Sequence, residues 1–488
     1  MAKTPQSSTS LGPESGQVGQ ASRGGNDAHS GPAWLNRRVS SNARRPVAEA
    51  GRKFVRERFI RPVAVFVDTE ASGGIVLLAA AFAALIWANS PWDERYFDLW
   101  HAHLSLDLNL VRFDQSLGHA VNDGLMAVFF FVVGLEIKRE LVHGELATVR
   151  KAALPAAAAF GGMLVPALFY TAFNFGGDGA KGWGIPVATD IAFAMGVLAL
   201  LGRRAPFSLK VFLLALAIVD DLGAIVVIAL FYTESISFEA VAWAIAIGGL
   251  IFALGKAGVR SVDVYVALGI VFWAAVFKTG VHATIAGVLL AMMTPSRPYL
   301  TPEAFDASAE ELLTAYRQAR AHGDTEAQQQ ILRQVEALSR DTESPLDRLE
   351  HTLHPWVSYL IVPVFALANA GVALSGDLLG DAAASSVSLG ILLGLVVGKP
   401  IGILIACFLA IRFGIAELPS NTGYRHMAGA GLLAGIGFTV SLFITGLAFD
   451  SPVLVDEAKV GILAASTVAG IIGFVYLWVL PGEPPERA

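Results

Sequence analysis

Two neighbouring aspartates, Asp220 and Asp221, lie inside an apolar stretch that runs from residue 207 to residue 231. The stretch is longer than the roughly 20 residues that a helix needs to cross a bilayer. An ionised Asp at the centre of a membrane helix costs about 2.5–3.5 kcal/mol, and membrane helices carry such residues almost only where they line an ion or proton path. The pair therefore indicates a functional site inside a membrane.

Further polar residues interrupt other apolar stretches. Thr189 and Asp190 follow a proline, Lys399 lies between two glycines, and the segment Gly435-Ile-Gly-Phe-Thr439 breaks an apolar run near the C-terminus. Isolated in a membrane, the aspartates and the lysine would together cost roughly 10 kcal/mol or more, so they must pair, bind ions or be protonated. Breaks at corresponding places in the two halves of a chain are typical of a binding site at mid-membrane.

The chemistry of buried carboxyl groups limits what such a site can hold. Burial disfavours the charged form of a carboxyl group, so the site can hold protons or a small cation but not both. Oxygen ligands suit a hard cation. Adjacent residues on a helix point about 100° apart, so we expect different roles for Asp220 and Asp221.

The composition agrees with a membrane protein. Of 488 residues, 54% are hydrophobic and only 16% are charged, against about 25% charged in soluble proteins. The single cysteine, Cys407, excludes a disulfide framework within the chain. The segment Gly394-Leu-Val-Val-Gly-Lys-Pro400 lacks the spacing and the Ser or Thr of a phosphate-binding loop, which argues against an ATP-driven pump. We expect no cofactor and no nucleic-acid partner.

The apolar pattern predicts about twelve membrane spans, some of them short or broken. Their approximate bounds are 73–88, 121–141, 152–173, 187–201, 207–231, 240–254, 262–277, 283–293, 356–374, 389–411, 427–448 and 460–480. An even number of spans places both termini on one side of the membrane. Because basic residues collect between residues 37 and 61, directly before the first span, we expect that side to be the cytoplasm.

The remaining segments define the predicted domain organisation. The membrane domain comprises residues 51–480 and contains two insertions. Strict alternation at residues 104–110 predicts a hairpin in an external loop, 91–118. Helical apolar stripes predict a pair of helices in a cytoplasmic insertion, 297–347. Residues 1–50 are expected to be a disordered cytoplasmic tail, and residues 481–488 a cytoplasmic C-terminal tail.

Several motifs, taken in order, resemble those of the NhaA-type sodium/proton antiporters. Examples are Ala188-Thr-Asp-Ile-Ala-Phe193 and Val219-Asp-Asp-Leu-Gly223. The others lie at residues 122–130, 134–141, 280–284, 349–356, 398–402 and 435–439. The resemblance runs from about residue 73 to residue 480, and it does not extend to the N-terminal tail or to the 297–347 insertion.

The resemblance implies an all-α integral membrane protein of twelve helices, built from inverted three-helix repeats, in which the fourth and eleventh spans are discontinuous and cross. It implies that Asp221 is the main ligand of the transported sodium ion, with Asp190 and Thr189 nearby, and that Asp220 pairs with Lys399 and gates the site. It also implies a cytoplasmic pH-responsive funnel formed by Glu136, Glu140, Glu350, His351 and His354. Asp123 and His282 are expected to be accessory residues.

The function implied is that of a secondary active transporter, not an enzyme. It would exchange sodium or lithium for protons across the bacterial inner membrane, with pH regulation, as a homodimer joined by the external hairpin and surrounded by membrane lipid. Two alternatives stay open. An intramembrane aspartyl protease also needs two membrane aspartates, but it would have no use for Lys399. A cation channel could use the same aspartates, and only obligatory proton-for-cation exchange would separate the two.

Overall fold

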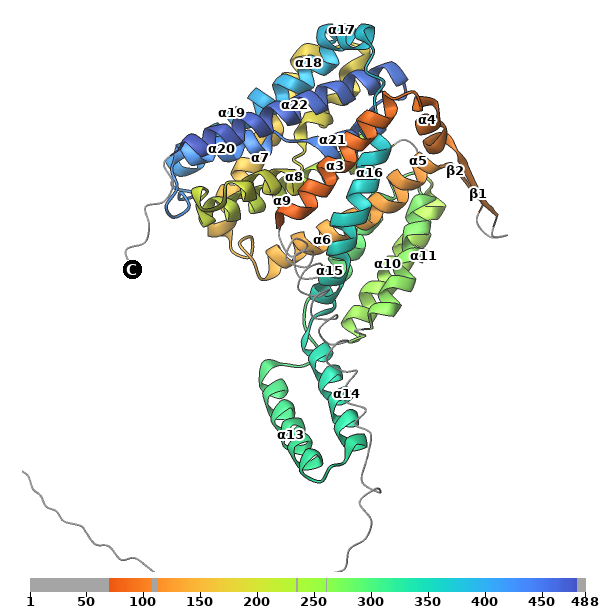
Figure 1. The fold of residues 1–488 in the computed structure, drawn as a ribbon, viewed down its shortest axis with the longest axis vertical. Helices are drawn as coiled ribbons and strands as arrows, with labels where there is room; N and C mark the ends of the chain where they lie inside the picture. Colours follow the sequence, from red (N-terminus) through yellow and green to blue (C-terminus); the bar gives the residue numbers. More distant parts are fainter. Residues whose placement is uncertain (1–69, 108–111, 234–235, 260, 481–488) are drawn as a thin grey trace, which may run out of the picture. The chain divides into compact units, whose positions relative to one another are not determined.

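The computed structural model describes residues 70–107, 112–233, 236–259 and 261–480. The predicted tails, 1–50 and 481–488, lie outside these residues. The described chain is almost entirely helical, with one small pair of strands (Figure 1). The predicted all-α class is therefore confirmed.

The helices and strands follow one another in this order: α3 (Glu70–Ala88), α4 (Asp93–His101), β1 (His103–Asp107), β2 (Arg112–Ser116), α5 (Leu117–Ala120), α6 (Met126–Val142), α7 (Val149–Asn174), α8 (Ile191–Leu200), α9 (Phe207–Phe231), α10 (Phe238–Lys256), α11 (Val262–Phe277), α12 (Thr284–Met293), α13 (Pro302–Ala321), α14 (Thr325–Thr342), α15 (Pro345–Trp356), α16 (Val362–Asn369), α17 (Gly376–Ala384), α18 (Ser386–Leu393), α19 (Lys399–Arg412), α20 (Tyr424–Ala434), α21 (Phe438–Ala448) and α22 (Pro452–Val479). Short 3₁₀ segments occur at Asp178–Val187 and Gly202–Arg204, and π-helical turns occur at Val121–Leu125, Val357–Ile361 and Gly394–Gly398.

Several of these helices are suited to a membrane. Within the described residues, seven helices are long and apolar enough to cross a bilayer, and three further helix pairs meet this criterion together but bend by more than 40°. The shorter apolar helices α11 and α12 fall on two more of the predicted spans. The chain is thus a multi-pass membrane protein. Each predicted span has a helical counterpart, while the number of crossings and the inverted repeats stay predictions.

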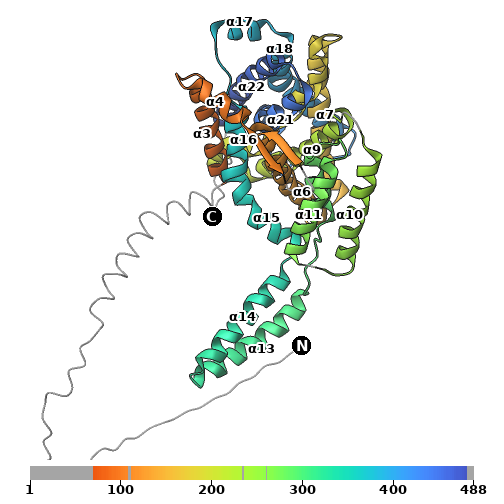
Figure 2. The same cartoon turned by 90° about the vertical axis from the view of Figure 1, so that its right-hand side faces the viewer.

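Exposed apolar side chains cover the outer faces of several helices. α10 and α11 lie side by side in both ribbon views (Figures 1 and 2). The outer face of α10 carries Trp243 and Ile245, and that of α11 carries Ile270, all of which are exposed. Apolar patches of this kind are rare on soluble monomers and typical of helices in contact with hydrocarbon.

Glycines allow α7 and α19 to approach closely. A Cβ atom on Gly161 would lie 2.3 Å from the backbone oxygen of Gly402, and one on Gly402 would lie 2.1 Å from the backbone oxygen of Gly161. No larger residue fits this crossing without moving a helix, as in other membrane bundles with small residues at their interfaces. The close contact holds α19, which begins at Lys399, against the centre of the bundle.

The predicted starts of three spans were wrong, and for the twelfth the helix α22 begins at Pro452 rather than near residue 460. The fourth span does not begin at Val187, because the 3₁₀ segment Asp178–Val187 precedes the break and forms the first half of a bent pair. This segment contains glycines and charged residues, so it does not form the continuous apolar stretch by which the spans were predicted. The ninth span begins at Pro345 rather than Trp356, and its helix continues through Pro355 into a π-helical turn at Val357–Ile361.

The two insertions contain regular structure. In the external loop, β1 and β2 pair antiparallel, with Leu104 opposite Gln115, and the residues between the strands lie outside the described part. In the second insertion, α13 and α14 pack against each other (Figure 2). Gly323, with φ +71°, ends α13, and Asp324 caps α14 by accepting hydrogen bonds from the next turn.

Candidate functional site

Two broken helices meet at the centre of the bundle. One break, Ala188-Thr189-Asp190, separates the 3₁₀ segment from α8, and the other, Gly435-Ile436-Gly437, separates α20 from α21. The two pairs bend by 45° and 47°. The Asp190 backbone N–H donates to the Ile436 backbone oxygen at 2.7 Å, so the breaks lie directly against each other.

Asp190 links two helix N-termini. Its Oδ1 accepts from the Phe193 backbone N–H at 2.9 Å, which caps α8. Its Oδ2 accepts from the backbone N–H and the hydroxyl of Thr439, at 3.1 and 2.6 Å, in the first turn of α21. A carboxylate at this position stabilises the positive ends of both helix dipoles.

Asp220 is paired with Lys399 in a fully buried ion pair. The Lys399 Nζ lies 2.7 Å from Asp220 Oδ2 and also donates to the Val187 backbone oxygen. The Thr189 hydroxyl lies 2.7 Å from the same Oδ2 and 2.9 Å from the Ala434 oxygen. Since a hydroxyl has one proton, it donates to one of these acceptors at a time, and a carboxylate is the stronger acceptor. This is the pair that the resemblance implied, and its gating role stays a prediction.

Asp221 differs from its neighbour. It is 1% exposed, and its Oδ1 has no hydrogen-bond partner within the described part of the protein. Oδ1 of Asp220 is also buried and also has no hydrogen-bond partner in this part of the protein. A buried polar atom without a partner is costly, so these oxygens call for a proton or a cation. The described residues contain no group of three or more His, Cys, Asp or Glu suited to a resident metal, so a cation here would depend on hydroxyl and backbone oxygens as well.

A cavity of about 1180 Å³ leads towards this site. Four of the predicted funnel residues line it: Glu136, Glu350, His351 and His354. Ile218, two residues before Asp220, also lines it. The cavity therefore lies between the polar ends of α6 and α15 and the part of α9 that directly precedes the aspartates.

Three predicted residues do not line the cavity. Glu140 lies beside it, because its Oε1 is 4.0 Å from Arg139, and its Oε2 accepts a hydrogen bond from the Glu145 backbone N–H at 2.9 Å. Asp123 lies in the π-helical turn at the opposite end of the span from Glu136, about 20 Å away by the rise of a helix. His282 Nε2 lies 2.5 Å from the Tyr232 backbone oxygen, away from the aspartates. The structure thus does not bring these residues to the central site.

Sequence reasoning missed two residues of the site. Arg139 lines the cavity and forms an ion pair with Glu350, and Thr439 binds Asp190. The signal for Arg139 was its position one helical turn after Glu136. Thr439 already stood in the second break, where its hydroxyl had no assigned partner.

Comparisons with known proteins agree with this geometry. The chain is 48% identical over 438 residues to the Na⁺/H⁺ antiporter NhaA of Oleidesulfovibrio alaskensis, covering 88% of this chain and 97% of that protein. It is 47% identical over 426 residues to the Na⁺/H⁺ antiporter NhaA of Rhodopirellula baltica, covering 87% and 96%, and 49% identical over 418 residues to that of Wolinella succinogenes, covering 84% and 92%. The sequence profile described as Na⁺/H⁺ antiporter 1 matches residues 64–477. The chain therefore belongs to the Na⁺/H⁺ antiporter 1 family.

Proposed function

We propose that this chain is a secondary active antiporter that exchanges sodium for protons across a membrane. The observation that carries the proposal is the buried Asp221 carboxylate, whose Oδ1 has no partner in the described residues, beside two helix breaks that lie against each other. The names of its relatives, which are Na⁺/H⁺ antiporters, support sodium and protons as the exchanged ions. Lithium, which has the same charge and is smaller, is proposed as an alternative cargo.

In this mechanism, Asp221 holds either a proton or the cation. Asp190 and Thr189 would supply further oxygens, although Asp190 already accepts three hydrogen bonds from Phe193 and Thr439. A bound cation would therefore use its remaining lone pairs or displace the Thr439 hydroxyl. Because the charged carboxylate is stabilised by only one occupant at a time, proton uptake releases the cation. Opening the site alternately to the two sides would convert this competition into exchange.

Asp220 and Lys399 would gate the site. Asp220 Oδ2 already binds both the Lys399 ammonium and the Thr189 hydroxyl. A cation that approaches Asp221 raises the positive charge next to Lys399 and competes for the Thr189 oxygen. We infer that the ion pair rearranges when the cation enters, which would couple cation binding to a change in helix position.

We propose that the cavity at α6 and α15 sets the pH response. Its Glu136, Glu350, His351 and His354 side chains are titratable groups at one wall, with the Arg139–Glu350 ion pair among them. Glu140, 4.0 Å from Arg139, would contribute through this ion pair and through the Glu145 backbone that it binds. A change in the charge of this cluster alters how α15 is held against α6.

Other parts of the proposal concern the assembly. We propose a homodimer joined by β1 and β2, bacterial inner-membrane localisation, cytoplasmic N- and C-termini, and lipid contacts around the apolar helices. Asp123 and His282 are proposed as accessory residues at the side of the membrane away from the cavity. Deleting residues 103–116 should convert the dimer to a monomer in light scattering of the detergent-solubilised protein, and an unchanged mass would reject the hairpin as the interface.

The alternative functions fit the geometry less well. An aspartyl protease needs two carboxylates that converge on one water molecule, whereas Asp220 Oδ2 is occupied by Lys399 and Thr189. A channel would need a continuous polar path, whereas the two residues of α9 that line the cavity, Leu214 and Ile218, are apolar.

Everted membrane vesicles test the proposal. In vesicles energised to an acidic interior, adding sodium should release protons from the interior in proportion to the amount of this protein. A channel would carry sodium without moving protons in the opposite direction. No sodium-dependent proton movement above that of vesicles without the protein would refute the assignment.

A further inference from the structure

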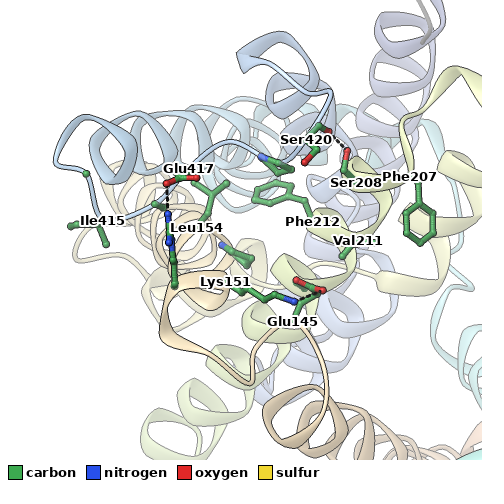
Figure 3. Close-up of a pocket in the computed structure, with 16 residues that line it drawn as sticks. Glu145, Lys151, Leu154, Phe207, Ser208, Val211, Phe212, Ile415, Glu417 and Ser420 are labelled. Atoms are coloured by element: carbon green, nitrogen blue, oxygen red, sulfur yellow. Dashed lines mark hydrogen bonds and ion pairs between the residues drawn. The ribbon is translucent and has the colours of Figure 1, made fainter. Parts of the chain in front are cut away.

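A second cavity, of about 670 Å³, lies where α7 and α9 begin and where the chain turns from α19 to α20. None of its lining residues belongs to the cavity that leads to the aspartates. Figure 3 shows Val211 and Phe212 along its wall, with Glu145, Lys151 and Glu417 around it. The wall is apolar and the mouth is charged, so an occupant of this cavity must be amphipathic.

The mouth carries two cations and two carboxylates. Arg150 lies 2.6 Å from Glu417, and Lys151 lies 3.3 Å from Glu145. The Arg150 and Glu417 side chains are 83% and 79% exposed, so this ion pair is in contact with solvent. Exposed ion pairs contribute little to stability because water and salt screen them. A charged ligand can therefore replace either pair at small cost.

The depth of the cavity points to a lipid rather than a water-soluble molecule. α7 and α9 are both long enough and apolar enough to span a membrane, and the cavity lies at the first turns of both. Large apolar side chains at its rim are exposed, with Phe207 at 78% and Ile415 at 61%. Exposed apolar groups beside ion pairs are typical of the level where hydrocarbon meets the headgroup region.

We propose that this cavity binds a phospholipid whose headgroup carries both a phosphate and a primary ammonium, as phosphatidylethanolamine does. The phosphate would accept hydrogen bonds from Arg150 and Lys151, and the ammonium would donate to Glu417 and Glu145. One acyl chain would lie along the wall at Phe212. Charge complementarity selects this headgroup, because a purely anionic lipid would bring its phosphate against two carboxylates without a compensating ammonium.

Comparing two lipids that differ only at the ammonium tests the proposal. Phosphatidylcholine carries the same charges, but its quaternary ammonium has no N–H to donate to Glu417 and Glu145. The delipidated full-length protein would be mixed in detergent with equal amounts of phosphatidylethanolamine, phosphatidylcholine and phosphatidylglycerol, and bound lipids counted by native mass spectrometry. We expect phosphatidylethanolamine to be retained roughly tenfold better than phosphatidylcholine, the ratio that corresponds to losing charge-assisted hydrogen bonds.

Variants separate the headgroup from the chain. The double variant Glu145→Gln, Glu417→Gln should reduce the preference for phosphatidylethanolamine over phosphatidylcholine to about twofold or less while keeping some lipid bound. Val211→Trp, which fills the cavity, should lower the retention of all three lipids. Arg204→Ala is a control outside the cavity, since Arg204 stacks on Trp478 at 4.2 Å and is not one of the lining residues. It removes an exposed arginine and should leave retention unchanged.

Three outcomes would overturn the proposal. Equal retention of phosphatidylethanolamine and phosphatidylcholine by the wild type would show that the carboxylates do not bind the ammonium. A preference for phosphatidylglycerol would show that the cavity binds an anionic lipid instead. An unchanged preference for phosphatidylethanolamine over phosphatidylcholine in the double glutamine variant would place the bound lipid elsewhere. The double variant alters only exposed side chains, so it tests the proposal even where Val211→Trp does not fold. None of these outcomes bears on sodium/proton exchange, which is measured separately.

Discussion

Replacing Lys399 with Met should destabilise the protein strongly, and a second substitution, Asp220→Asn, should recover most of the loss. Both side chains of the Lys399–Asp220 ion pair are 0% exposed. Removing one partner of a buried pair costs about 3–5 kcal/mol, because it leaves the other charge without compensation. Lys399→Met keeps the length of the side chain and removes its charge, so cavity formation adds little. Asp220→Asn alone should be destabilising for the same reason, since it leaves Lys399 unpaired.

The double variant should be more stable than either single variant. With both charges absent, the amide that replaces the Asp220 carboxylate can still bind the Thr189 hydroxyl, and the remaining deficit is the Val187 backbone oxygen, which loses the Lys399 donor. An unsatisfied buried acceptor costs about 1–3 kcal/mol. The cycle should therefore show a coupling of at least about 3 kcal/mol between the two positions.

Thermal unfolding of the four purified proteins in one detergent gives the order of stability. We expect the wild type to be the most stable, the double variant next, and the two single variants last. Lys399→Arg serves as a control that keeps the charge. It should be milder than Lys399→Met, although the guanidinium is poorly shaped for a single carboxylate oxygen and a backbone carbonyl. A Lys399→Met protein as stable as the wild type, or additive losses in the double variant, would refute the reasoning.

The remaining predictions concern ion binding, pH and packing. Asp221→Asn keeps the size of the side chain and removes its charge, so sodium-dependent proton flux in everted vesicles should be lost, and a near wild-type rate would remove Asp221 from the site. Replacing His351 and His354 together with Ala should shift the pH of half-maximal exchange and leave the sodium affinity at high pH largely intact, and an unshifted profile would exclude the pair from the pH response. Gly402→Ala should lower thermal stability by about 1–3 kcal/mol or more, because its Cβ would lie 2.1 Å from a backbone oxygen. The matched control is Gly446→Ala, whose Cβ would have no atom within 4 Å, and it should leave thermal stability unchanged. Equal losses of stability in the two variants would contradict the packing argument.

The central site could be located from the sequence because membranes make charges expensive. Asp190, Asp220, Asp221 and Lys399 stand out against apolar surroundings, and a chain tolerates them only where they pair or bind. The helix breaks could be located for a similar reason, since glycine and proline interrupt apolar runs at two places. The all-α class followed from the length of the apolar stretches.

Long-range partners could not be predicted in this way. Arg139 and Glu350 are separated by 211 residues, and no local pattern links them. The same holds for Thr439 and Asp190, which are 249 residues apart and meet only because the two helix breaks lie against each other. The Asp178–Val187 segment could not be recognised as part of a span, because it is rich in glycine and carries charges. Such contacts depend on how the helices pack, and the hydrophobic periodicity of a single helix does not determine its packing partners.

The two central aspartates show why neighbouring residues with equal burial need not share a role. Asp220 and Asp221 are 0% and 1% exposed, and both stand on α9. The helix turns about 100° between them, so only Asp220 reaches Lys399 and Thr189. Burial therefore explains why each carboxylate needs a positive partner, while the helical rotation decides which one finds it in the protein. Under the proposed exchange, the cation competes with the proton at Asp221 because Lys399 already compensates the charge of Asp220.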